Sequence, residues 1–329
     1  MSLVRADNRP APLLEVKDLS LEFRTRDGLV HALEDVNFEI AKGEMVGIVG
    51  ESGSGKSVMC YAVMGILDGA ARIGSGSAVF GGLDLLHARQ ADLEEIRGRE
   101  ISMIFQNPRT ALNPIRKVGR QIEDVLRRHT TTLRDNLKAR AIECLTQVRI
   151  PDPARRYAAY PFELSGGQCQ RIMIALALAC NPALLIADEP TTGLDVTTQA
   201  AIMDLIRELS LSRGMSTLLI THDLGLAAEH CDRIVVMHAG HIVESASTEE
   251  IFRSPKHPYT AKLIAATPQG ASKLRELTSI AGNLPDLRRS NLPPCRFSER
   301  CERVTANCAQ KLVQAVVAPG HTVTCWNPQ

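Results

Sequence analysis

At 329 residues the chain is long enough to bury a large core and to form two or more lobes. A net charge of +1, with 23% charged residues, excludes a basic surplus of the kind that attracts nucleic acid, so we expect no nucleic-acid partner. The longest apolar run, residues 172–180, is far shorter than the roughly 20 residues that span a bilayer, and residues 1–12 lack the apolar core of a signal peptide, which predicts a cytoplasmic protein with reduced cysteines.

Short apolar stretches separated by polar turns predict a strand-rich lobe at the start of the chain. They cover residues 14–23, 30–40 and 45–49. Phe23 is a candidate to stack on a purine base, because a flat ring offers apolar area to the base. A place in the core explains this aromatic side chain equally well.

Residues 50–57 match G-x-x-x-x-G-K-[ST] at every fixed position and directly follow the apolar strand at 45–49. Glycines let backbone N–H groups surround a triphosphate, and the helix expected at 58–67 directs its positive end at the same phosphates. Lys56 adds a charge, and Ser57 can bind magnesium. A ligand-free Gly/Ser-rich turn is the alternative. The candidate binding residues are Gly50, Ser52, Gly53, Ser54, Gly55, Lys56, Ser57 and Val58.

A second apolar strand, residues 101–105, runs into Gln106, which can sense a metal ion or simply cap a turn. Two Asn-Pro pairs then force turns. The apolar spacing over residues 120–149 predicts helices with polar outer faces, and therefore an inserted helical lobe.

A second glycine-rich segment reads Leu-Ser-Gly-Gly-Gln at residues 164–168 and precedes an apolar helix expected at 171–180. A serine and two glycines at a helix N-terminus are suited to bind an anion. The candidate residues are Ser165, Gly166, Gly167 and Gln168.

Asp188 and Glu189 follow the apolar strand at 183–187. Carboxylates at the end of a buried strand are costly unless they act, so we expect Asp188 to hold magnesium and Glu189 to polarise the attacking water. A solvated strand end is the alternative. Asp195 opens a helix expected at 196–210 and suits either the active surface or a helix cap.

His222 ends a further strand, residues 217–220, at the same edge of the predicted sheet. A lone histidine there is more often structural than catalytic. A hairpin around residues 239–240 follows, and the nucleotide-binding unit is expected to end near residue 252.

In their order and spacing, these motifs resemble the nucleotide-binding subunit of ABC transporters over about residues 13–255. The resemblance implies an α/β P-loop NTPase (RecA-like) ABC fold with an N-terminal β-rich lobe and a helical subdomain at about residues 107–170. It implies ATP and Mg²⁺ as ligands, and a signature sequence at 164–168. It also implies that Gln106 is the Q-loop glutamine at the magnesium, that Glu189 is the catalytic carboxylate and that His222 is the switch histidine.

Residues 105–108, 112–114 and 257–260, with the cysteines downstream, further resemble the D-type ATPase of oligopeptide and dipeptide importers. Residues 256–329 are then its C-terminal extension. Cys169 and Gln170 depart from the family, in which an arginine or lysine is common after the signature.

The importer resemblance implies ATP sites shared with a second, F-type ATPase chain. It implies two membrane permeases, an extracytoplasmic substrate-binding protein and a peripheral location at the cytoplasmic face of the inner membrane. Nickel, heme and antimicrobial peptides remain alternative cargoes, and a soluble ABC ATPase not coupled to transport remains an alternative function.

Cys295, Cys301, Cys308 and Cys325 form a C-x5-C-x6-C-x16-C cluster near the C-terminus. Structural zinc sites usually contain closer C-x2-4-C pairs, whereas four thiolates on irregular loops can hold a [4Fe–4S] cluster, as some D-type subunits do. Zinc and unligated thiols are the alternatives. Because residues 285–329 contain few large apolar side chains, we expect the metal to be structural.

Overall fold

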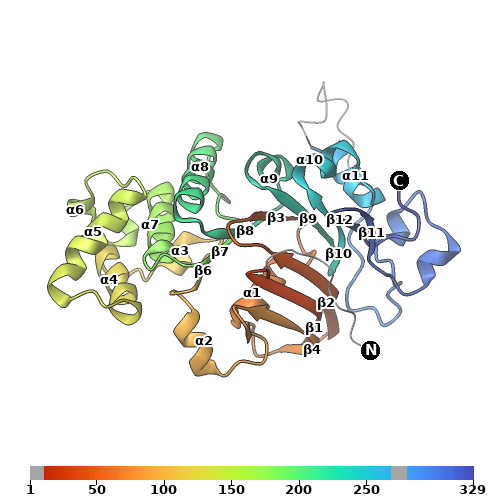
Figure 1. Cartoon of the computed structure of the whole chain (residues 1–329), viewed down its shortest axis with the longest axis horizontal. Coiled ribbons are helices and arrows are strands. Elements are labelled where there is room, and N and C mark those ends of the chain that lie inside the picture. The colour runs from red at the N-terminus through yellow and green to blue at the C-terminus, as the bar shows by residue number, and fades with distance from the viewer. Residues whose placement is uncertain (1–10, 268–279) are drawn as a thin grey trace.

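The computed structural model describes residues 11–267 and 280–329, and Figure 1 shows two sheets between a helical lobe and the C-terminal extension. Residues 1–10, which carry most of the segment used to predict that no signal peptide is present, lie outside the described residues. Within the described ranges, no helix is long and apolar enough to cross a membrane.

A small antiparallel sheet forms the predicted strand-rich lobe. Its spatial order is β2 (Gly28–Ile40), β1 (Leu14–Thr25), β4 (Ala71–Phe80) and β5 (Leu83–Asp84). In β1, the apolar side chains of Leu14, Val16, Leu19 and Leu21 are buried, while the polar residues between them are exposed or half-buried. This alternation is what a sheet with one covered face requires. Strands β4 and β5 were not predicted.

A large mixed sheet carries the site. Its order is β11 (Ala315–Ala318), β12 (His321–Val323), β10 (His241–Ser247), β9 (Arg233–His238), β3 (Met45–Val49), β8 (Ser216–Thr221), β7 (Leu184–Asp188) and β6 (Ile101–Ile104). The strands from β9 to β6 run parallel, so their carboxyl ends share one edge.

Both faces of the parallel strands are covered, which explains their continuous apolar sequences. In β3, Val46 and Ile48 belong to the core shared with the small sheet, whereas Met45 and Val49 belong to the core shared with the helices. The helices outside the lobe are α1 (Lys56–Met64), α2 (Gln90–Ile96), α8 (Val196–Arg213), α9 (Leu224–His230), α10 (Thr248–Arg253) and α11 (Pro258–Ala265).

The helical lobe lies at the end of the molecule away from the C-terminus (Figure 1). It contains α3 (Pro108–Ala111), α4 (Val118–His129), α5 (Leu137–Gln147), α6 (Pro153–Arg156) and α7 (Gly166–Leu178), with 3-10 turns η1 (Arg134–Asn136) and η2 (Pro161–Glu163). The predicted apolar positions of α4 and α5, among them Ile122 and Leu145, are buried in its core. Helix α7 also packs against β6 and so joins the lobe to the sheet.

The C-terminal extension is anchored to the large sheet and includes the 3-10 turns η5 (Ser298–Arg300) and η6 (Ala306–Ala309). Strand β12 pairs with β10. The fully buried Glu244 on β10 accepts hydrogen bonds from the backbone N–H groups of Lys256 and His257, at 2.6 and 2.8 Å. Its carboxylate also lies 2.7 Å from His321 Nε2 on β12. The extension therefore contributes strands to the same sheet. The domain limits of 13–255 for the nucleotide-binding domain, 107–170 for its helical subdomain and 256–329 for the extension stay predictions.

Candidate functional site

Residues 50–57, called the phosphate loop here, run from the end of β3 into the first turn of α1 at the carboxyl edge of the large sheet. Gly50 has φ 157°, and a Cβ atom there would lie 2.1 Å from the Met237 carbonyl oxygen, so a side chain cannot be accommodated. Gly55, with φ 101°, is the N-cap of α1. The loop thus depends on glycine for its backbone path and for the close approach of β9.

Lys56 lies in the first turn of α1 with its side chain folded back over the phosphate loop. Its Nζ donates to the carbonyl oxygens of Gly50 and Glu51, at 2.8 and 3.0 Å. Burial lowers the pKa of Lys56, and the carboxylates of Glu189 and Asp188 oppose that shift. The ammonium group and the helix N-terminus therefore supply positive charge where the motif predicts a triphosphate.

Two oxygen ligands meet where the last residue of the phosphate loop, Ser57, contacts Asp188. The Ser57 hydroxyl donates to Asp188 Oδ1 at 2.9 Å. Burial raises the pKa of Asp188, and hydroxyl donors on Ser57 and Tyr61 counteract part of that rise. A hydroxyl and a carboxylate are oxygen donors of the kind that Mg²⁺ prefers, so these two side chains fit the predicted ion.

Glu189 directly follows β7 and has a left-handed backbone conformation, with φ 45°, which is uncommon for a residue with a side chain. Its N–H donates to the Ile220 carbonyl oxygen of β8 at 3.0 Å. This bond fixes the strand end. The backbone turn then directs the carboxylate toward the side chains that follow neighbouring strands.

The Glu189 carboxylate is surrounded by donors from three segments. Gln106 Nε2 and Thr192 Oγ1 donate to Oε2 at 2.7 and 3.0 Å, and His222 Nδ1 lies 3.3 Å from Oε1. Burial raises the pKa of Glu189, but hydrogen bonds from His222, Thr192 and Gln106 outweigh it, and the pKa falls below its usual value. The carboxylate is therefore ionised at neutral pH.

Sequence reasoning assigned no role to Thr192, although it lies three residues after Glu189 in the same turn. The Thr192 N–H also donates to the Glu189 carbonyl oxygen at 3.2 Å. A hydroxyl residue in a tight turn directly after a strand-end carboxylate is the local signal that could have identified it.

The signature residues 165–168 cap α7. Ser165 Oγ accepts from the Gln168 N–H at 3.3 Å, and Gln168 Oε1 accepts from the Ser165 N–H at 3.1 Å. This capping box explains why the helix begins at Gly166, earlier than predicted. A Cβ atom on Gly167 would lie 3.2 Å from Thr198 Cγ2 of α8. In the described part of the chain, no hydrogen bond or ion pair joins residues 165–168 to the phosphate loop.

The remaining candidates take structural positions in this conformation. Asp195 caps α8, with Oδ1 accepting from the Thr198 N–H at 3.0 Å and Oδ2 from its hydroxyl at 2.7 Å. Phe23 and Val58 are half-buried and pack against the core beneath the small sheet. Within the loop, Ser54 is buried, whereas Ser52 and Gly53 are exposed.

The four C-terminal cysteines are unpaired thiols, of which Cys295 and Cys308 are buried. Burial, with smaller contributions from the other three, raises the pKa of Cys295 to about 11. Backbone N–H groups of Thr305 and Asn327 donate to the sulfur atoms of Cys308 and Cys325, at 3.5 and 3.4 Å. Over residues 11–267 and 280–329, however, no three His, Cys, Asp or Glu side chains form a group that could hold a metal ion.

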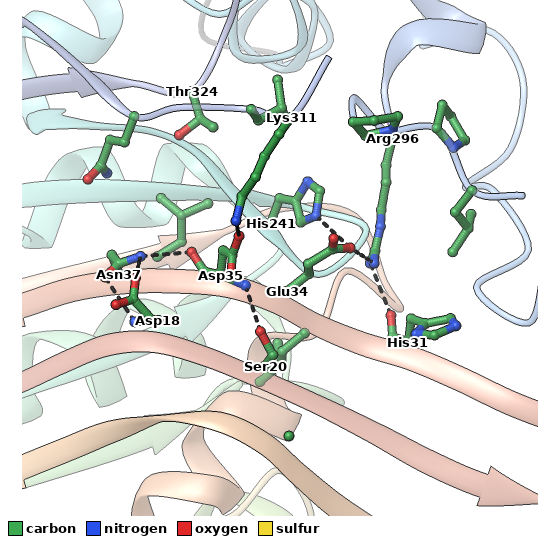
Figure 2. A pocket seen from close by; sticks show the side chains of 18 of the residues that line it. Asp18, Ser20, His31, Glu34, Asp35, Asn37, His241, Arg296, Lys311 and Thr324 are labelled. Carbon is green, nitrogen blue, oxygen red and sulfur yellow. Dashed lines mark hydrogen bonds and ion pairs between the residues drawn. The ribbon is translucent and has the colours of Figure 1, made fainter. Parts of the chain in front are cut away.

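A cavity of about 1030 Å³ lies away from these groups, between the small sheet and the extension. Figure 2 shows that polar side chains on its walls face one another. Lys311 Nζ lies 3.0 Å from an Asp35 carboxylate oxygen, and the Asn37 amide donates to Asp18 at 3.1 Å. Because the cavity includes none of Lys56, Asp188 and Glu189, it is separate from the phosphate site.

Comparisons with known proteins assign the family. Residues 33–192 match the ABC transporter family, and residues 243–308 match the C-terminal region of oligopeptide/dipeptide transporters. The oligopeptide transport ATP-binding protein OppD of Salmonella typhimurium is 44% identical over 327 residues, which cover 98% of this chain and 97% of that protein. The chain belongs to the family of ABC transporter ATP-binding proteins.

Other members of this ABC family show 44% and 48% identity. The dipeptide transport ATP-binding protein DppD of Haemophilus influenzae is 44% identical over 96% of each chain. A peptide import ATP-binding protein of Brucella abortus is 48% identical over 92% of this chain and 91% of its own length. The predicted family, with its C-terminal region of the importer type, is confirmed.

Solved structures confirm the ABC fold. The ATP-binding cassette MJ0796, solved as a dimer in a post-hydrolysis state with ADP and Pi, has a TM-score of 0.65 and 29% identity, covering 71% of this chain and 98% of its own. CbiO1 from Clostridium perfringens has a TM-score of 0.62 and 28% identity, covering 74% and 91%. This chain is the ATP-binding subunit of an ABC transporter.

Proposed function

We propose that this chain hydrolyses ATP to drive the import of peptides or related small solutes through partner permeases. The observation that carries the chemistry is the ionised Glu189 carboxylate held by Gln106, Thr192 and His222 beside the phosphate loop. The cargo class is supported by relatives that are named for oligopeptide and dipeptide transport.

The polar side chains of the site divide the tasks of hydrolysis among them. Glu189 orients a water molecule for in-line attack on the γ-phosphorus and accepts its proton, while the bond from that phosphorus to the β,γ-bridging oxygen breaks. Lys56 and the N-terminus of α1 stabilise the charge on the phosphate oxygens. His222 and Thr192 hold the carboxylate in place. Mg²⁺, held by Ser57 and Asp188 with Gln106 nearby, would neutralise charge on the β- and γ-phosphates.

A second ATPase subunit completes the proposed site. In the described part of this chain, residues 165–168 form no hydrogen bond or ion pair with the phosphate loop. This separation of the two anion-binding elements supports a site that is shared between chains. Two chains placed head to tail would bring the signature of one onto the loop of the other. We propose an F-type partner chain, two permeases and an external substrate-binding protein, with this subunit peripheral at the cytoplasmic face of the inner membrane.

Reconstituted transport tests this function. The chain should co-purify with two polytopic membrane proteins, and the complex in proteoliposomes with its binding protein should accumulate labelled di- or oligopeptides only with Mg-ATP. A complex carrying Lys56→Ala serves as the inactive control. Accumulation of nickel, heme or an antimicrobial peptide in place of simple peptides would reject the proposed cargo. A chain that hydrolyses ATP fully without membrane partners would reject the transport role.

We also propose that Cys295, Cys301, Cys308 and Cys325 hold a structural [4Fe–4S] cluster, with zinc as the alternative. The proposal rests on the wide spacing of the four cysteines and on the resemblance to D-type subunits that carry such a cluster. Backbone N–H groups that donate to the sulfur atoms of Cys308 and Cys325 would tune a cluster bound there. In the described ranges the four thiols do not form a group that could hold a metal ion, so binding of the cluster would require them to converge.

Anaerobic purification decides between the metals. We expect iron and acid-labile sulfide in equal amounts and a broad visible absorption, all lost in Cys301→Ser, with Cys60→Ser as the control that keeps them. One zinc per chain without sulfide would reject the cluster. A brown protein unaffected by Cys301→Ser would reject these four ligands.

A further inference from the structure

Glu51, the second residue of the phosphate loop, is held by two residues of the C-terminal extension. Arg300 Nη1 and Nη2 donate to the two carboxylate oxygens of Glu51 at 2.8 and 2.9 Å. The Tyr259 hydroxyl accepts from the Glu51 backbone N–H at 3.0 Å. A two-pronged arginine–carboxylate pair fixes orientation as well as distance. The extension thus contacts the loop through both the side chain and the backbone of one residue.

The residues that hold Glu51 are themselves fixed by packing. The Arg300 side chain is only 6% exposed, and the Tyr259 and Phe297 side chains are fully buried. The His238 ring packs edge-on against Tyr259 and Phe297, with centroids 4.6 and 5.2 Å apart. His238 Nε2 accepts from Arg300 Nη1 at 3.3 Å. Arg300 therefore has little freedom to leave Glu51 while the surrounding segment stays folded.

A second arginine connects the same segment to the far side of the loop. Arg296 is buried and donates to the Ala239 carbonyl oxygen at 2.5 Å. It also donates to the His31 carbonyl oxygen at 3.0 Å and pairs with Glu34 (Figure 2). Ala239 and Gly240 form the turn between β9 and β10, and the Gly240 N–H donates to the Ser54 carbonyl oxygen at 2.8 Å. Residues 295–301 thus reach the phosphate loop both directly at Glu51 and through the β9–β10 turn at Ser54.

We propose that Arg300 and Tyr259 are positioning residues for ATP, and that the C-terminal extension sets the nucleotide affinity of this subunit. The inference rests on the proposed ATP hydrolysis at this site. The Glu51 carbonyl oxygen also accepts from Lys56 Nζ at 3.0 Å, so a displaced Glu51 moves one anchor of the phosphate-binding lysine. Neither residue contacts Glu189. Their loss therefore changes the affinity for ATP and leaves the bond-breaking step intact.

Arg300→Met tests the inference in the full chain and in the assembled importer. We expect the dissociation constant and the KM for Mg-ATP to rise about tenfold, which corresponds to about 1.4 kcal/mol, with kcat within about twofold of the unmodified complex. Arg300→Lys keeps the charge but not the two-pronged geometry. Its dissociation constant for Mg-ATP should therefore lie between those of the unmodified chain and of Arg300→Met. The double variant Glu51→Gln with Arg300→Met should bind ATP no more weakly than the single variant that binds it more weakly. The reason is that both changes break the same Arg300–Glu51 ion pair.

Arg289→Met is the matched control, because Arg289 lies in the same extension and pairs with Glu299 at 2.8 Å without touching the loop. It should bind ATP normally. An unchanged affinity in a folded Arg300→Met chain, or strictly additive effects in the double variant, would overturn the inference. If Arg300→Met does not fold, unchanged affinity in both Arg300→Lys and Glu51→Gln would overturn it. Absence of hydrolysis in the unmodified complex would instead reject the proposed function.

Discussion

Adjacent carboxylates at the end of β7 have pKa values shifted in opposite directions. Burial raises the pKa of Asp188, whereas three side-chain donors hold the pKa of Glu189 below its usual value despite its own burial. Such a divergence is typical of catalytic pairs with different tasks. In the proposed mechanism Glu189 acts on the attacking water, and Asp188 with Ser57 holds the ion.

Thr192→Val tests whether the hydrogen bond from the Thr192 hydroxyl to the Glu189 carboxylate contributes to hydrolysis. The change removes a hydrogen bond to a charged group, which is worth about 1.5–3 kcal/mol, so we expect kcat to fall about tenfold or more while ATP affinity stays unchanged. Steady-state hydrolysis by the assembled complex measures this loss. Thr192→Ser keeps the hydroxyl and is the matched control. Equal kcat values for the Val and Ser variants would show that the hydrogen bond does not matter.

Sequence motifs identified most of the residues that meet at this site. Gln106, Asp188, Glu189 and His222 were selected because each follows an apolar strand, and the carboxyl ends of parallel strands share one edge. Arg300 could not be identified in this way. No local pattern distinguishes an arginine that forms an ion pair 249 positions away from one that faces solvent.

At the scale of elements, the extension depends on more than the proposed metal. From the sequence, we predicted a weakly apolar segment that a metal holds in place. That prediction missed two contacts that form only when the large sheet is folded. Strand β12 pairs with β10, and Phe297 is buried against Tyr259 and His257. These contacts join residues distant in sequence, so hydrophobic periodicity within the segment could not reveal them.

Buried histidines at the start of α11 and the end of β9 predict a pH-dependent stability. Burial lowers the pKa of His257 and of His238 to about 3. Both rings are therefore neutral in the folded chain, whereas the unfolded chain binds protons near pH 6.5. Their contribution is complete above pH 6.5 and is lost as the pH falls toward 3.

Urea unfolding at pH 7.5 and pH 5.5 measures this effect. We expect the free energy of unfolding to fall by about 1–2 kcal/mol for each histidine over that interval, because one pH unit below 6.5 corresponds to about 1.4 kcal/mol. His257→Asn keeps a side chain that can cap α11, and it should reduce the fall by about half. A free energy of unfolding that does not change between the two pH values would contradict neutral buried rings.

At the scale of the whole molecule, the phosphate loop lies between the helical lobe at one end and the extension at the other (Figure 1). The sequence predicted this order of parts because each part has a local signature. It could not predict that β11 and β12 extend the large sheet, since two short strands leave almost no periodic signal.

The isolated chain should hydrolyse ATP slowly and gain activity when it is combined with its partner ATPase and permeases. The reason is the proposed shared site, in which another chain supplies to each phosphate loop the signature residues that here cap α7. Light scattering with a simultaneous hydrolysis assay checks this prediction. Full turnover by a demonstrated monomer would show that the shared-site architecture is wrong.

The most direct test of the central claim compares hydrolysis with nucleotide binding in the complex assembled with Glu189→Gln. The variant removes the base while keeping a side chain of the same size, so we predict that turnover falls at least about a hundredfold and ATP affinity stays within about twofold. Lys56→Ala should give the opposite pattern, with weakened binding. Normal turnover in the Glu189→Gln complex would contradict the assignment of Glu189 as the carboxylate that activates water.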